Sequence, residues 1–96
     1  MAKFQLGRLC ATRGVADTMN EQPGFAQFVH QSLARYIAGD WGNLTQPDKA
    51  MNDEAVRRGD ERILAAYEHT GQPARRIWII TEADRSATTV LFPDEY

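Results

Sequence analysis

The sequence has little of the side chains that build metal centres and disulfides. It contains one cysteine, Cys10, and two histidines, His30 and His69. A single cysteine excludes a disulfide within the chain, and neither histidine has a second His or Cys at the short spacing of a metal-binding motif. We therefore expect neither a metal site nor a cofactor. Because Cys10 lies between Leu9 and Ala11, the sequence predicts a buried, unreactive thiol rather than a nucleophile.

The chain also lacks a long hydrophobic run. No apolar stretch approaches the ~20 residues that a membrane-spanning helix needs. The residues after Lys3 are too mixed in polarity for a secretory signal. We therefore expect a cytoplasmic protein that does not bind a membrane.

An excess of charge of either sign is missing as well. The 11 Lys and Arg residues are balanced by 13 Asp and Glu residues, which gives a net charge of −2. Broad nucleic-acid binding needs a concentrated positive field. Nucleic acid is therefore the less favoured partner, and we expect a protein partner.

The residues that are present predict one α+β domain over residues 1–96, with its main helix in the first half. Pro23 suits the first turn of this helix, and Gly39 suits the position just past its end. Leu33 lies at the centre of the expected buried stripe. The apolar residues at helical spacing are Phe25, Phe28, Val29, Leu33, Tyr36 and Ile37.

Two shorter helices are predicted from their ends. Thr12 suits the N-cap of a helix over residues 14–20, and Thr45 suits the N-cap of a helix over residues 47–58 that Gly59 would stop. The second of these has a thin apolar face, so we expect it at the surface.

After Gly59 the apolar residues change to a period of two. Residues 62–69, 75–82 and 86–92 read as three strands, and residues 4–11 read as a short or bulged strand. The short connections between the three strands favour antiparallel hairpins. The fold class expected is α+β, with an antiparallel three- to four-stranded sheet packed against two or three helices.

No established catalytic motif is present, so the candidate sites come from local charge. Neither Ser32 nor Ser86 lies in a nucleophile elbow. The tight turn that contains Glu82, Asp84 and Arg85 has the groups for an anion or acid–base site. The structural interpretation is that Asp84 caps the turn and Arg85 pairs with Glu82.

The second candidate segment is Asp40-Trp41-Gly42-Asn43. Trp41 has two interpretations: an anchor for a partner, because Trp is enriched at interface hot spots, or a lid that covers the core at the helix end. We favour the lid. We also expect Trp41 to contact the Asp84–Arg85 turn, with Arg85 stacking on the indole ring and Asp84 accepting its N–H.

These segments belong to a pattern that resembles a family of small bacterial proteins carried on plasmids and integrated elements. Its members are called plasmid-related proteins, or are mislabelled as subunit M of type I restriction endonucleases. The resemblance implies a mobile-element context and no catalytic residues. The matching residues are Phe4-Gln5-Leu6-Gly7, Ala11-Thr12-Arg13-Gly14, Gly39-Asp40-Trp41-Gly42, Asp48-Lys49-Ala50, Asn52-Asp53, Gly59, Arg62-Ile63-Leu64, Tyr67, the run from Trp78 to Ser86, Thr88-Thr89, Pro93 and Tyr96.

The leading hypothesis is a non-catalytic accessory protein of a mobile element that acts by macromolecular binding. One version of it is inhibition of host defence such as restriction or CRISPR. The candidate binding residues are Asp40, Trp41, Asn43, Glu82, Asp84 and Arg85. One alternative is a small hydrolytic or nucleic-acid-processing enzyme that uses Asp40, Glu82, Asp84 and Arg85. Another is a sequence-tolerant nucleic-acid binder that uses Trp41 and the arginines.

Overall fold

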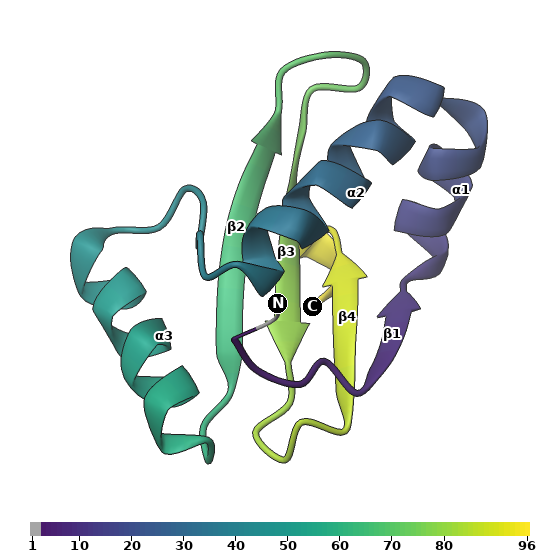
Figure 1. Ribbon diagram of the computed structural model, residues 1–96. Coiled ribbons are helices and arrows are strands. Elements are labelled where there is room, and N and C mark those ends of the chain that lie inside the picture. The colour runs from purple at the N-terminus through teal and green to yellow at the C-terminus, as the bar shows by residue number, and fades with distance from the viewer. Residues whose placement is uncertain (1–2) are drawn as a thin grey trace.

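A four-stranded sheet in the order β1-β4-β3-β2 forms the centre of the computed structural model, which describes residues 3–96 (Figure 1). Helices α1 and α2 cover one face, and α3 lies beside β2. The elements are β1 (Arg8–Ala11), α1 (Arg13–Glu21), α2 (Pro23–Ile37), α3 (Gln46–Arg58), β2 (Ile63–His69), β3 (Arg75–Thr81), β4 (Ala87–Leu91) and the 3₁₀ turn η1 (Pro93–Glu95). The predicted α+β class and the three predicted helices are confirmed.

The predicted all-antiparallel sheet is wrong at its first strand. β2, β3 and β4 pair antiparallel as expected, but β1 pairs parallel with β4, from Arg8↔Ala87 to Ala11↔Val90. The two strands are far apart in the chain, so no hairpin sets their direction. The strand also begins at Arg8, because Gly7 has a φ of 65° and its backbone lies against Ser86: a Cβ there would come within 2.4 Å of the Ser86 carbonyl group.

The core lies between α2 and the sheet. Phe25, Val29, Ser32 and Tyr36 are the buried residues of α2, whereas Leu33 is only partly buried. The buried face is therefore turned slightly away from the stripe centre that the sequence predicted. The sheet residues that share this core are Ile63, Ala65, Tyr67, Ile77, Ile79, Val90 and, just after β4, Phe92.

A chain of hydroxyl groups crosses this core. The Tyr36 hydroxyl is 2.7 Å from Thr81 Oγ1, which is 2.7 Å from Thr88 Oγ1, and Thr88 donates to the Leu6 carbonyl at 2.8 Å. Each buried hydroxyl thus has a partner, as stable interiors require. Desolvation by burial raises the pKa of Tyr36 above its ordinary range, so the phenol stays neutral. This series of hydrogen bonds connects α2, the strands β3 and β4, and the N-terminal segment.

The outer edge of β2 is closed by other parts of the chain. The Asn52 side chain on α3 donates to the Leu64 carbonyl at 2.7 Å and accepts from the Leu64 N–H at 3.4 Å. Two residues further along β2, Ala66 N–H donates to the Trp41 carbonyl and Asn43 N–H donates to the Ala66 carbonyl. An exposed strand edge invites unwanted pairing, and this one has no free positions at Leu64 and Ala66.

Two further observations concern the remaining predictions. Cys10, predicted to be buried, is partly exposed because it lies on the edge strand β1. Over residues 3–96, no helix is both long and apolar enough to cross a membrane.

Candidate functional site

Asp40 fixes the exit of α2. Its carboxylate accepts from the Arg35 guanidinium at 2.8 and 3.2 Å and from Gly42 N–H at 3.1 Å. The hydrogen bond from Arg35 lowers the pKa of Asp40 below its ordinary value. The Asp40 carbonyl accepts from the Tyr67 hydroxyl at 2.6 Å. These contacts hold the chain where it leaves α2 and runs along the edge of β2 before α3 begins.

We expect Asp40→Asn to remove an acid-sensitive part of the stability. The folded-state pKa of Asp40 is depressed, so its contribution is complete above the unfolded pKa of ~3.9 and is lost as the pH falls through the folded value. The difference in unfolding free energy between wild type and Asp40→Asn should therefore shrink from pH 6 to pH 3. Urea unfolding at both pH values measures it. An unchanged difference would show that the Arg35–Asp40 pair does not stabilise the fold.

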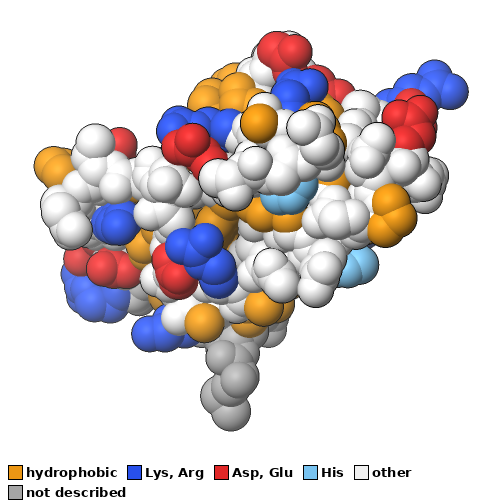
Figure 2. Space-filling view, turned by 90° about the horizontal axis from the view of Figure 1, so that it is seen from above, with side chains coloured by type: hydrophobic (Ala, Val, Ile, Leu, Met, Phe, Trp, Pro, Cys, Tyr) orange, Lys and Arg blue, Asp and Glu red, His pale blue; other side chains and the backbone are white. Residues whose placement is uncertain are grey.

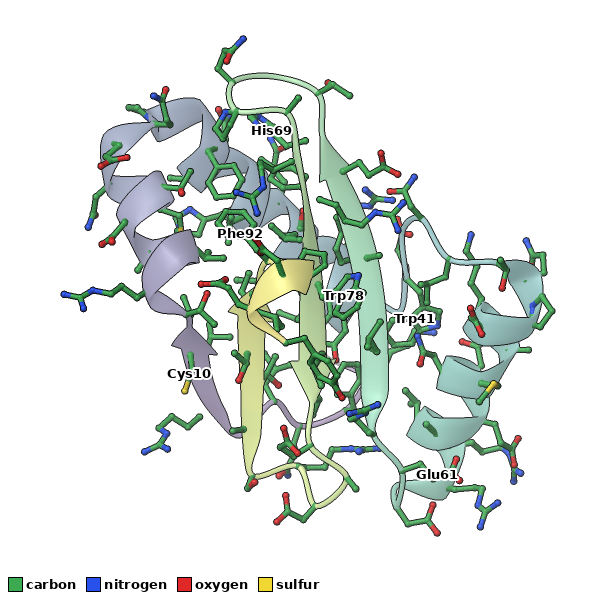
Figure 3. All side chains as sticks on the ribbon, turned by 180° about the vertical axis from the view of Figure 1, so that it is seen from behind. Cys10, Trp41, Glu61, His69, Trp78 and Phe92 are labelled. Atoms are coloured by element: carbon green, nitrogen blue, oxygen red, sulfur yellow. The ribbon has the colours of Figure 1, made fainter. Side chains whose placement is uncertain are left out.

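Trp41 is part of the core, as the lid interpretation predicted. It is 3% exposed, and its ring packs edge-on against Tyr36 with centroids 5.6 Å apart. Its indole N–H donates to Asp53 on α3 at 2.9 Å, not to Asp84 as predicted. Figure 3 shows Trp41 between β2 and α3. The neighbouring Asn43 is exposed and uses its backbone N–H to close the edge of β2.

The β3–β4 turn has a structural role as well. Asp84 accepts from Ser86 N–H at 2.9 Å, so the predicted turn cap is confirmed, and this bonding lowers the pKa of Asp84. Arg85 has a φ of 62° and donates to backbone carbonyls: Ala55 at 2.9 Å, Glu61 at 2.6 Å, and Glu82 and Ala83 at 3.3 Å. Arg85 thus bonds the carbonyl of Glu82 rather than its carboxylate, and it ties the turn to the C-terminal part of α3.

The two predicted segments attach to different levels of β2. Gly42 bridges to Ala66, whereas the β3–β4 turn follows Thr81, which pairs with Ile63. Three residues of strand correspond to about 10 Å. The segments share α3 instead, because Trp41 bonds it at Asp53 and Arg85 bonds it at Ala55. The carboxylates of Asp40 and Asp84 each serve their own turn and do not form a joint site.

A groove that the sequence did not predict lies between α3 and the start of β2. Its volume is about 310 Å³, and its lining combines an apolar floor with charged groups. Among the residues that line it, Met51 is 67% exposed, and Arg62 bonds the Tyr96 hydroxyl and lies 5.6 Å from the centre of that ring. The lining residues are Leu44, Asp48, Met51, Asn52, Glu61, Arg62 and Leu64. The sequence contained one indication of this groove: Met51 is a large apolar residue on a helix whose apolar face is otherwise thin.

The charges of this groove are acidic in excess. Asp48 and Glu61 make no ion pair with any residue between 3 and 96, and Arg62 is the only basic residue of the lining. Glu61 lies at the end of α3 in Figure 3. Over the described residues, no cluster of three or more His, Cys, Asp or Glu side chains has metal-binding geometry. The groove is thus an apolar depression with free carboxylates at its rim.

Comparisons with known proteins returned no matching family model, no similar curated protein and no similar solved structure.

Proposed function

We propose that the chain is a non-catalytic protein-binding module that receives its partner in the groove between α3 and β2. The observation that carries this proposal is that the polar side chains of the predicted sites hold the fold together, whereas the carboxylates of the groove make no ion pair within the described residues. Asp40, Asp84 and Arg85 are engaged in holding turns and α3, which leaves them poorly placed for acid–base chemistry. The groove, by contrast, has an exposed methionine and free carboxylates.

The lining defines the chemistry of the partner. Leu44 and Leu64 offer an apolar floor, and Met51 is flexible enough to adapt to a side chain placed there. Free carboxylates of Asp48 and Glu61 at the rim attract a cation. The occupant proposed is therefore a protein segment with an apolar side chain next to a Lys or Arg.

Two observations disfavour nucleic acid as the partner. The groove carries two carboxylates against one guanidinium, a balance that repels phosphates. Figure 2 also shows basic and acidic side chains interspersed on the face seen from above, rather than a continuous basic area.

The genetic context proposed rests on the resemblance of the matching residues to plasmid-related proteins. In that context the chain is a cytoplasmic accessory protein of a plasmid or integrated element. Inhibition of a host defence system such as restriction or CRISPR is the version of this role in which protein binding alone suffices. The fold itself does not distinguish between these roles, because one fold serves many functions.

A photo-crosslinking amino acid at Met51 tests the site. We expect it to trap one protein in host cells, whereas the same amino acid at Gln31, an exposed residue of α2, should not. The trapped protein is then purified and its affinity is measured by calorimetry. Glu61→Lys with Asp48→Lys should weaken binding at least ~10-fold, because both rim charges reverse.

Three outcomes would contradict the proposal. The first is equal trapping from Met51 and Gln31. The second is unchanged affinity of the double charge reversal with the purified partner. The third is tight binding of the chain to single- or double-stranded nucleic acid that the charge reversal strengthens, which would favour the nucleic-acid alternative.

A further inference from the structure

The two edges of the sheet differ in whether other parts of the chain cover them. The β2 edge is closed by Asn52, Trp41 and Asn43, but β1 is the outermost strand on the other side, with no element beyond it in Figure 1. Its residue Leu9 is 52% exposed. A strand edge with free backbone groups and an exposed leucine is a site for pairing with another strand.

The backbone groups that point outward belong to Leu9 and Ala11. Arg8 N–H donates to the Ser86 carbonyl and Thr12 N–H donates to the Val90 carbonyl, each at 3.0 Å. In a strand, alternate residues direct their N–H and C=O groups to the same side. The groups of Leu9 and Ala11 therefore face away from β4. Gly7, with a φ of 65°, ends this extended stretch on one side, and α1 ends it at Arg13.

Leu9 and Ala11 can pair with the same two residues of a second copy of the chain. In an antiparallel pairing of two β1 strands about a twofold axis, Leu9 of each copy lies opposite Ala11 of the other and exchanges two hydrogen bonds with it. Cys10 then lies opposite Cys10 of the second copy as a non-hydrogen-bonded pair, with Cα atoms ~4.5 Å apart.

In this register, charged side chains of opposite sign from the two copies come close together. Arg8, Cys10 and Thr12 share one face of β1, and Arg8 lies opposite Thr12 of the second copy. The Thr12 hydroxyl donates to Glu95 at 2.6 Å, so a carboxylate lies beside this position. Arg8 is exposed and forms no ion pair within residues 3–96. In such a pairing, two Arg8–Glu95 ion pairs can form, one at each end of the paired strands.

The apolar groups match on the other face. Leu9 and Ala11 face the helices and border a shallow groove of about 180 Å³ that Met19, Val29 and Leu33 also line. Leu9 of the second copy, placed opposite Ala11, lies over this groove. Burial of the exposed leucine then favours pairing, because apolar surface leaves water.

We propose that the chain forms a twofold homodimer in which two β1 strands pair antiparallel, with Leu9 opposite Ala11 and Arg8 beside Glu95 of the second copy. The two sheets join into one continuous sheet of eight strands. The α3–β2 groove lies at the far edge of each sheet, so the dimer presents two copies of it. This inference does not depend on what that groove binds.

Sedimentation and cross-linking test the dimer and its register. We expect a concentration-dependent dimer that Arg8→Glu weakens at least ~10-fold, because two ion pairs become repulsive. Arg58→Glu, at an exposed arginine of α3, serves as the matched control and should leave the dimer intact. A chain that stays monomeric up to ~1 mM overturns the proposal.

The register is tested with diamide, which takes up the two thiol hydrogens as a disulfide forms. Wild type should give a Cys10–Cys10 dimer, because ~4.5 Å between Cα atoms lies within the range of a disulfide. In a Leu9→Cys, Cys10→Ser variant the two cysteines are offset by about two residues, or ~7 Å along the strands, and should cross-link poorly. Efficient cross-linking of this variant and not of wild type would overturn the proposed register. Arg8→Glu should suppress the wild-type cross-link.

Discussion

Replacing Trp41 with alanine is expected to lower the free energy of unfolding by ~3–5 kcal/mol, the usual cost of removing a buried aromatic side chain. The ring is 3% exposed and packs against Tyr36 and Phe4, so its loss leaves a cavity between α2 and β2. Trp41→Phe keeps most of this packing and loses the hydrogen bond to Asp53. It should cost only about 1–2 kcal/mol, because the exposed carboxylate regains water. Denaturant unfolding measures both changes.

The second tryptophan supplies the control. Trp78 is half-buried on the opposite face of the sheet, where its ring meets the exposed Tyr96 with centroids 5.6 Å apart. Trp78→Ala should therefore cost less than Trp41→Ala. If Trp41→Ala left stability unchanged and weakened partner binding instead, the residue would be an interface anchor, and the structural assignment would be wrong.

The helices were predictable because their signals are local. Thr12 and Thr45 accept the backbone N–H groups of Val15 and Asp48, each at 3.4 Å, at the predicted helix starts. The apolar stripe from Phe25 identified α2, but its exact orientation depends on what it meets. Tyr36 turns toward Thr81 to satisfy its hydroxyl, and this contact over 45 residues has no local signature.

The direction of β1 was not predictable from its residues. A four-residue strand carries the same alternation whether it pairs parallel or antiparallel. The direction is decided by the long connection from β1 to β4, which includes three helices and the strands β2 and β3, and by the close approach of Gly7 to Ser86. Both are properties of the assembled fold.

The candidate residues were identified by type, whereas their roles depend on their neighbours. The same charges that suit a catalytic site also suit the capping of turns, and the structure gives Asp40, Asp84 and Arg85 this second role. The groove escaped prediction because Leu44, Met51 and Leu64 come from three separate segments. Only packing of α3 against β2 brings them together.

Replacing Gly42 with alanine is expected to destabilise the protein by ~2–5 kcal/mol. Gly42 has a φ of 73°, and a left-handed conformation costs an L-residue roughly 1–2 kcal/mol. A Cβ at this position would also lie 2.1 Å from the Ala66 carbonyl oxygen and 2.7 Å from the Tyr67 ring. Gly42 forms a β-bridge with Ala66, so the contact with the Ala66 carbonyl can be relieved only if the backbone moves. Overpacking of this kind adds about 1–3 kcal/mol.

Gly59 separates the two effects. Its φ of 77° is nearly the same, but a Cβ there would meet no atom within 4 Å. Gly59→Ala should therefore cost only the conformational ~1–2 kcal/mol. Hydrogen exchange adds a local readout, since Gly42→Ala should expose the Ala66 and Asn43 amides that close the β2 edge, while Gly59→Ala should leave their protection unchanged. Equal losses of stability in the two variants would mean that the segment from Asp40 to Asn43 is not held against β2, and that this edge of the sheet is open.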